Sequence, residues 1–192
     1  MPNLDTLVAM AFDPRLVLLN GPPGAGKTTV AARLKVRFAG TGRLAVVEHD
    51  DFALMAGAPA VGEASVRTWT SSLHALTAAA LAYAKDGFSV LVVVNYGRAR
   101  RELLERLLDP TPVRHVLLLP PWEVSHARVL ERLAEPSPPA LPYIGLDAHR
   151  QFYEDLCSMV SEGEFDEVID SAHETVQMAD THLTHHLGLT AI

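Results

Sequence analysis

A glycine-rich segment of eight residues constrains this chain more than any other feature. It reads Gly21-Pro22-Pro23-Gly24-Ala25-Gly26-Lys27-Thr28 and fits the pattern G-x-x-x-x-G-K-S/T. Before it lies Arg15 to Asn20, an apolar run typical of a buried strand, and from Lys27 to Ala39 the apolar residues have helical spacing. A turn of this kind directs backbone N–H groups and the positive end of a helix at a phosphate. The segment therefore predicts a nucleoside triphosphate site.

The last two residues of this phosphate loop have distinct roles in the prediction. Lys27 places a cation between the outer phosphates, and the hydroxyl of Thr28 is a ligand for Mg²⁺. The chain has only three lysines, so composition does not account for a lysine at this position. We expect the nucleotide to contact the whole loop and Thr29, which follows it.

Strands and helices alternate along the rest of the chain. The predicted strands are 44–48, 89–94, 114–119 and 167–170, and the predicted helices are 65–85, 98–108, 121–134 and 147–161. Continuous apolar strands indicate an α/β fold with a parallel sheet covered by helices on both faces. The length of 192 residues predicts a single domain over 1–192. Within it we expect an acceptor-binding insert at about 52–70 and a short lid at about 128–150.

Composition excludes several classes of function. The formal net charge of −7 argues against a general nucleic-acid binder, which needs a cationic face. No apolar run approaches the ~20 residues of a membrane span, and residues 1–13 do not resemble a signal peptide. The single cysteine, Cys157, suits a reducing compartment, and we expect it to be buried. These features predict a cytoplasmic protein without a membrane or nucleic-acid partner, either a monomer or a homodimer.

An acidic pair follows the second predicted strand. The chain there reads Glu48-His49-Asp50-Asp51-Phe52. In parallel α/β sheets ligands bind beyond the carboxyl ends of the strands, so Asp50 or Asp51 should lie near the γ-phosphate. A carboxylate there can orient an acceptor hydroxyl, take its proton and help to hold Mg²⁺ through water. The alternative is a solvated loop in which an aspartate caps a helix.

With its phosphate loop and this acidic pair, the sequence resembles the small P-loop kinases, which include the shikimate, gluconate and nucleoside kinases and the chloramphenicol phosphotransferase group. The resemblance implies a three-layer P-loop NTPase fold with five parallel strands in the order 2-3-1-4-5. It also implies ATP with Mg²⁺, and Asp50, or secondly Asp51, as the residue that contacts or deprotonates the acceptor hydroxyl.

The third strand departs from a pattern common among P-loop enzymes. It leads into Asn95-Tyr96-Gly97-Arg98, where many of them have an aspartate that holds the Mg²⁺ shell. Asn95 can still bind a metal-bound water or the substrate, and gluconate kinases also lack the aspartate. The departure disfavours a motor or AAA-type ATPase. Arg98, Arg100 and Arg101 could bind an anionic substrate, or else pair with Glu102 and Glu105 on a solvated helix.

Arginines after the fourth strand match the lid of such kinases, which covers the phosphates. Arg128 and Arg132 are four residues apart and share a helix face, and Arg150 follows a proline-rich loop. We expect Arg128 to contact the nucleotide, and Arg132 and Arg150 to stabilise the transferring phosphoryl group. The alternative is surface arginines paired with Glu131 or Asp147.

These features together predict a phosphotransferase that moves the γ-phosphate of ATP to a hydroxyl of an antibiotic, a metabolite or a nucleoside. The segment 52–69 is rich in Ala, Gly and Val, which suggests a largely neutral and partly apolar acceptor. The alternative is a resistance or regulatory module that binds nucleotide and ligand without phosphotransfer. A GTPase would need an N-K-x-D motif, which the sequence lacks. We expect Trp69 and Trp122 to fill the core.

Overall fold

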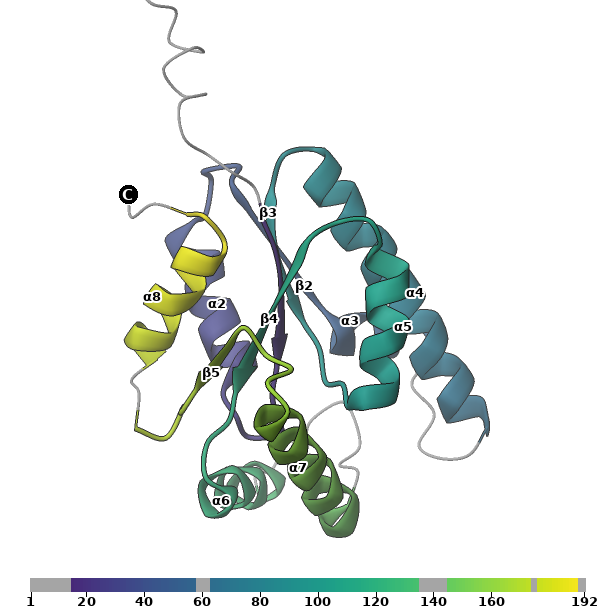
Figure 1. The fold of residues 1–192 in the computed structure, drawn as a ribbon, viewed down its shortest axis with the longest axis vertical. Coiled ribbons are helices and arrows are strands. Elements are labelled where there is room, and N and C mark those ends of the chain that lie inside the picture. Colours follow the sequence, from purple (N-terminus) through teal and green to yellow (C-terminus); the bar gives the residue numbers. More distant parts are fainter. Residues whose placement is uncertain (1–14, 58–62, 135–144, 174–175, 190–192) are drawn as a thin grey trace, which may run out of the picture.

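A parallel sheet lies at the centre of the computed structural model, which describes residues 15–57, 63–134, 145–173 and 176–189 (Figure 1). Its order is β2-β3-β1-β4-β5, which confirms the expected topology. Every neighbouring pair runs parallel. The strands are β1 (Leu16–Asn20), β2 (Leu44–Glu48), β3 (Ser89–Val93), β4 (Val113–Leu118) and β5 (Glu167–Ile169).

Helices cover both faces of the sheet because successive residues of each central strand point to opposite sides. Leu16 and Leu18 of β1 pack against helices of one layer, whereas Val17 and Leu19 face the other layer. All four side chains are buried, which explains why β1 is continuously apolar. The helices are α2 (Lys27–Arg37), α3 (His49–Met55), α4 (Glu63–Lys85), α5 (Arg98–Leu108), α6 (Trp122–Leu133), α7 (Leu146–Ser161) and α8 (Val176–His186).

The helix layers cover the two faces of the sheet and leave the carboxyl ends of the strands for a site. Helices α2 and α8 lie on one face, and α4 and α5 lie on the other (Figure 1). Helices α6 and α7 lie beyond the carboxyl ends of the strands, at the lower end of Figure 1. In the part of the chain that the structure describes, no helix is long and apolar enough to cross a membrane.

One short helix lies where the sequence predicted only an acidic pair after a strand. Helix α3 begins at His49, so Asp50 and Asp51 lie in its first turn. Carboxylates are favourable there because the N-terminal end of a helix carries partial positive charge. Consecutive residues of a helix point about 100° apart, which gives the two aspartates different surroundings.

Three expectations about single side chains were wrong. Cys157 is exposed, because Leu156 and Met159 take the buried face of α7 and leave it outward. Trp69 and Trp122 are only partly buried and do not fill the core.

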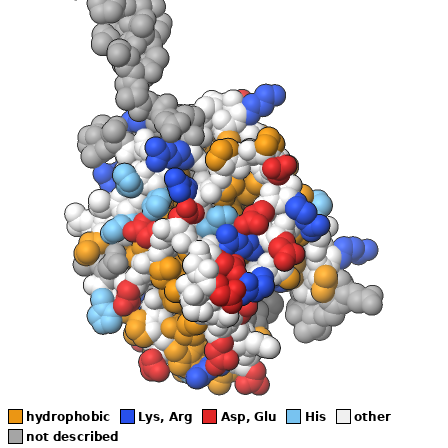
Figure 2. Space-filling view, viewed as in Figure 1, with side chains coloured by type: hydrophobic (Ala, Val, Ile, Leu, Met, Phe, Trp, Pro, Cys, Tyr) orange, Lys and Arg blue, Asp and Glu red, His pale blue; other side chains and the backbone are white. Residues whose placement is uncertain are grey.

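On the face drawn in Figure 2, acidic and basic side chains lie intermixed rather than in areas of one sign.

Candidate active site

A cavity of about 450 Å³ opens at the carboxyl edge of the sheet. Segments on both sides of β1 form its walls: the β2–α3 junction, α4 and the end of β3 on one side, and α6 and the start of α8 on the other. The predicted site residues that line it are Pro23, Gly24, Ala25, Gly26, Lys27, Thr28, Thr29, Asp50, Asn95, Arg128 and Arg132. The predicted site residues outside its lining are Gly21, Pro22, Asp51, Arg98 and Arg150.

The phosphate loop requires glycine at two positions for a tertiary reason as well as a local one. Gly24 has φ +78°, and a Cβ there would lie 2.5 Å from the carbonyl oxygen of Ser125 in α6. Gly21 has φ +155°, and its Cβ would lie 2.5 Å from the carbonyl oxygen of Leu118 at the end of β4. A side chain at either position would displace backbone, so the loop can lie this close to β4 and α6 only with glycine.

Lys27 is buried at the start of α2, and its ammonium binds the loop that precedes it. Its Nζ donates hydrogen bonds to the carbonyl oxygens of Gly21 at 2.8 Å and Pro22 at 3.0 Å. Desolvation by burial lowers the pKa of Lys27 to about 8, while the nearby Asp50 carboxylate opposes this shift and Arg132 adds to it. Phosphate oxygens that replaced the two carbonyls would be better partners for a desolvated cation.

Of the acidic pair, the structure brings only Asp50 to the cavity. Desolvation by the surrounding protein raises the pKa of the Asp50 carboxyl above its ordinary value. The positive charge of Lys27 opposes this rise, and repulsion from Glu48 adds to it. Both aspartates are reached by solvent, but Asp51 lies outside the cavity lining. A carboxylate whose proton affinity is raised, in reach of the phosphate loop, has the properties of a general base.

Oxygen donors for a magnesium ion lie in the same cavity. Thr28 in the first turn of α2 and Asp50 in α3 both line it. Mg²⁺ in phosphate-transfer sites is bound by one or two protein oxygens together with phosphate oxygens and water. One hydroxyl and one carboxylate therefore fit this ion, and no further protein ligand is needed.

The three arginines predicted to belong to a lid have different partners. Arg128 joins two walls of the cavity, since its guanidinium donates to the carbonyl oxygens of Gly24 and Ser171, each at 3.2 Å. Arg132 is exposed on α6 and lines the cavity. Arg150 lies elsewhere, with its Nε 3.0 Å from Glu154 and its guanidinium 5.0 Å from the centre of the Trp122 ring.

A hydrogen-bonded chain joins the phosphate loop to α7, and the sequence did not reveal it. The hydroxyl of Ser125 in α6 donates to the carbonyl oxygen of Pro23 at 2.6 Å. His149 in α7 is buried, with its Nε2 3.1 Å from the same hydroxyl oxygen. Desolvation lowers the pKa of His149 to about 4, which keeps the ring neutral. Nothing in the spacing of these residues signals the contact, because the loop, α6 and α7 are separate in sequence.

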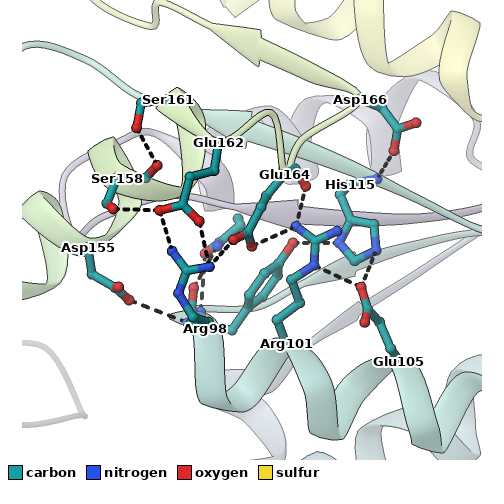
Figure 3. Close-up of polar contacts among 12 residues, drawn as sticks. Arg98, Arg101, Glu105, His115, Asp155, Ser158, Ser161, Glu162, Glu164 and Asp166 are labelled. Carbon is teal, nitrogen blue, oxygen red and sulfur yellow. Dashed lines mark hydrogen bonds and ion pairs between the residues drawn. The ribbon is translucent and has the colours of Figure 1, made fainter.

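Arg98 is held away from the cavity by carboxylates after α7 (Figure 3). Its guanidinium forms ion pairs with Glu162 at 2.9 Å and with Glu164. The predicted helical pair on this face is present only for Arg101, whose Nε lies 2.8 Å from Glu105. The anionic-substrate role proposed for Arg98 thus finds no support in the position of its side chain.

Two residues that the sequence analysis did not assign to the site form a wall of the cavity. The buried ring of His49 lies 4.7 Å from the Trp69 ring, measured between centroids, and both residues line the cavity. His49 Nε2 is 2.7 Å from the hydroxyl oxygen of Ser72. The guanidinium of Arg100 lies 5.5 Å from the centre of the Trp69 ring. A tryptophan seven residues into a long helix has no sequence signal that distinguishes a site wall from a core position.

The chain matches one protein family over most of its length. The family model described as an AAA domain covers residues 16–156. Asn95, at a position where many P-loop enzymes have an acidic residue, disfavours an AAA-type motor within this family. The similar solved structures include two kinases and a resistance protein. No curated protein is a significant match to the chain.

Several solved structures share the whole fold. A sugar kinase from Janibacter sp. HTCC2649 is 21% identical over 93% of this chain and 97% of that chain, with a TM-score of 0.62. The tunicamycin resistance protein of Deinococcus radiodurans is 22% identical over 93% and 98%, with a TM-score of 0.64. Shikimate kinase from Acinetobacter baumannii, in complex with shikimate, is 16% identical over 91% and 93%, with a TM-score of 0.61. At these identities the likeness establishes the fold.

Proposed function

The chain belongs to the kinase-like AAA domain family of P-loop proteins, and from this premise we propose that it transfers the γ-phosphate of ATP, with Mg²⁺, to a hydroxyl group of a small molecule. The observation that carries the proposal is the shared cavity of Lys27 and Asp50. A desolvated cation and a carboxylate with a raised pKa lie close enough there to shift each other's titration. Phosphate transfer to an alcohol needs this pair, one group for the phosphate and one for the proton.

The two sides of β1 divide the cavity between the substrates. On the β4–β5 side, Val129, Leu133, Val176 and Ala179 provide an apolar surface that suits the base of a nucleotide. On the β2–β3 side, Asp50 and the residues around it are left for the acceptor. This arrangement supports the predicted use of the insert at 52–70 for the acceptor and of 128–150 as a lid. Residues 58–62 and 135–144 of these segments lie outside the described residues.

In the proposed reaction Asp50 accepts the proton of the acceptor hydroxyl. The acceptor oxygen forms a bond to the γ-phosphorus as the bond from that phosphorus to the bridging oxygen of ADP breaks. Lys27 and Arg132 stabilise the negative charge on the transferring group, and Thr28 provides a ligand for Mg²⁺. Mg²⁺ neutralises phosphate charge when it is bound. Closure of the lid, in which we include Arg150, excludes water and so limits hydrolysis of ATP.

The decisive experiment measures ADP release from ATP and Mg²⁺ in the presence of a broad panel of alcohols. The panel includes a sugar, shikimate and tunicamycin, because structural relatives are described with these words. We expect at least one acceptor to stimulate ADP release and to become phosphorylated. Asp50→Asn should abolish the stimulation and leave ATP binding intact, while the matched control Asp51→Asn should keep the stimulation at neutral pH.

Two results would contradict the proposed phosphate transfer. If ATP and a ligand bind but no acceptor stimulates ADP release, the chain is the resistance or regulatory module that the sequence analysis left as the alternative. Unchanged turnover in Asp50→Asn would remove the base from the proposed mechanism.

A further inference from the structure

Two buried side-chain atoms have no hydrogen-bond partner among the described residues. Both belong to the side of the cavity that we assign to the substrate that accepts the phosphate. They are Nδ1 of His49 and Oδ1 of Asn95. Both residues line the cavity. Leaving a buried acceptor unpaired costs free energy, so such atoms are normally bonded to protein, water or ligand. Their position beside Asp50 points to a ligand that supplies the missing hydrogen atoms.

The hydrogen bonds around His49 determine which ring nitrogen carries its proton. The hydroxyl of Ser72 donates its only hydrogen to the carbonyl oxygen of Trp69 at 2.9 Å. The same oxygen lies 2.7 Å from His49 Nε2 and must therefore accept, so Nε2 carries the hydrogen. Desolvation lowers the pKa of His49 to about 4, which agrees with a neutral ring. Nδ1 is then a bare acceptor.

Asn95 and Asp50 both line the cavity, beyond the carboxyl ends of two neighbouring strands. Strands β2 and β3 pair with Glu48 opposite Val93, and Asp50 and Asn95 each follow two residues later. Together with His49 Nδ1, this end of the cavity presents three acceptor groups. A bound molecule must therefore donate hydrogen bonds to these groups from several O–H or N–H groups.

Charge and shape at this end narrow the class of molecule further. Asp50 and Glu48 line the cavity and repel an anion, whereas Arg100, which lies outside the lining with its guanidinium over the Trp69 ring, repels a cation. In the described part of the chain no carboxylate forms an ion pair with Arg100. The flat Trp69 ring lines the same cavity and suits the apolar C–H face of a ring. A neutral ring with hydroxyls on its edge fits both features.

From these contacts we propose that the acceptor is a neutral, hydroxyl-rich ring compound such as a sugar or cyclitol unit. One face packs on Trp69, two hydroxyls donate to His49 Nδ1 and Asn95 Oδ1, and a third faces Asp50. The inference rests on the proposed phosphotransfer function and sharpens its substrate class. It keeps the largely neutral acceptor suggested by the composition of 52–69 and replaces its partly apolar character with hydroxyl groups.

A binding assay that needs no turnover tests this subsite. In Trp122→Phe, Trp69 is the only tryptophan, so its fluorescence reports acceptor binding. Titrations are made with ADP and EDTA present, which removes any effect through metal-bound water at Asn95. The probes are neutral aldoses, nucleosides and cyclitols, with glucosamine and glucuronate as charged rings and cyclohexanol as a ring with a single hydroxyl.

We expect the tightest probe to be a neutral polyol that binds at least about tenfold better than charged rings or cyclohexanol. Removing one hydroxyl from that probe should weaken binding to the unmodified site about 10–100-fold. Asn95→Leu or His49→Phe should cause a similar loss and make one of the deoxy analogues bind as well as its parent. Asn95→Asp, which keeps an acceptor oxygen, is the matched control and should retain the preference.

Other outcomes overturn the subsite. They are a charged or singly hydroxylated ring as the best ligand, unchanged affinity for every deoxy analogue, or no polyol bound by protein that binds ADP. The deoxy series needs no substitution in the subsite, so it decides the matter even if His49→Phe does not fold. A polyol that binds but is never phosphorylated would contradict the kinase function and leave the subsite standing.

Discussion

The ammonium of Lys27 lies 2.8 Å from the carbonyl oxygen of Gly21, so the phosphate loop closes on its own lysine. The contact keeps a cation buried in a part of the molecule where water cannot solvate it fully. A triphosphate that enters the loop replaces carbonyl dipoles with full negative charges. The affinity of Lys27 for its proton must then differ between free and bound protein.

Nucleotide binding should therefore take up a proton at alkaline pH. Burial lowers the pKa of Lys27 from 10.5 to about 8, so the free protein is largely neutral at this residue at pH 9, whereas bound phosphates restore the charge. We expect the affinity for ADP to fall as pH rises above 8, with uptake approaching about one proton at pH 9 and none at pH 6.5. Calorimetry in buffers of different ionisation enthalpy measures it. Lys27→Arg stays charged throughout and should lose this uptake, and equal uptake in both proteins would contradict the assignment.

The pH profile of phosphate transfer should have an acidic limb that belongs to Asp50. Desolvation raises the pKa of this carboxyl above 3.8, and the base must be ionised to accept a proton. We expect kcat/KM to fall as pH drops through that raised pKa. Asp51→Asn removes a neighbouring negative charge and should shift the limb slightly to lower pH. An acidic limb that persists unchanged in an Asp50→Asn protein with residual activity would rule this assignment out.

Substitution of the three arginines predicted for the lid should have different effects on kcat and on the KM for ATP. Arg132→Ala is expected to lower kcat about 10²–10³-fold, because Arg132 lines the same cavity as Lys27 and Asp50. Arg128→Ala should mainly raise the KM for ATP, since Arg128 joins Gly24 to Ser171. Arg150→Ala should cost about tenfold, because Arg150 must first leave Glu154 and Trp122. Steady-state kinetics decide among them, and a larger loss at Arg150 than at Arg132 would reverse their order.

Gly24→Ala should destabilise the phosphate loop by more than the strain of an alanine at positive φ, because the added Cβ also meets backbone. The new Cβ would lie 2.5 Å from the Ser125 carbonyl oxygen at φ +78°. Gly40 is a matched control, since its φ is +72° and a Cβ there would have no atom within 4 Å. We expect Gly40→Ala to cost about 1 kcal/mol of unfolding free energy, and Gly24→Ala to cost more and to abolish ATP binding. Denaturant titrations and ADP binding test this, and equal losses would show that the close approach is unimportant.

Asp180 should stabilise the packing of α8 on α2. It is buried, and its carboxylate lies 2.8 Å from Arg33 Nε and 2.9 Å from Arg37 Nη1. Because both arginines are partly exposed, we expect Asp180→Asn to lower the unfolding free energy by about 1–3 kcal/mol, less than a fully buried pair. Glu154→Gln, which breaks an exposed pair on α7, should cost no more than about 0.5 kcal/mol. Similar values for the two variants in urea would contradict this.

The amino-acid sequence determined the five strands, most of the helices and the place of the phosphate loop, but not helix α3. Helix α5 was predicted with its exact bounds, and most other boundaries moved by one or two residues. Apolar periodicity and a glycine-lysine motif are local properties, so they can be recognised without knowledge of the partners. The strand order followed from resemblance to the small P-loop kinases and is confirmed.

The tertiary structure decided which side chains meet. Helix α3 places Asp50 in the lining of the cavity and Asp51 outside it, although the two are neighbours in sequence. Arg98 is held by Glu162 and Glu164, more than sixty residues away along the chain. Contacts of this kind depend on how separate helices pack on the sheet, and no periodicity within one segment records them. The sequence alone could thus predict a phosphate site, but only the packing of α3, α4 and α6 around the loop determined its other residues.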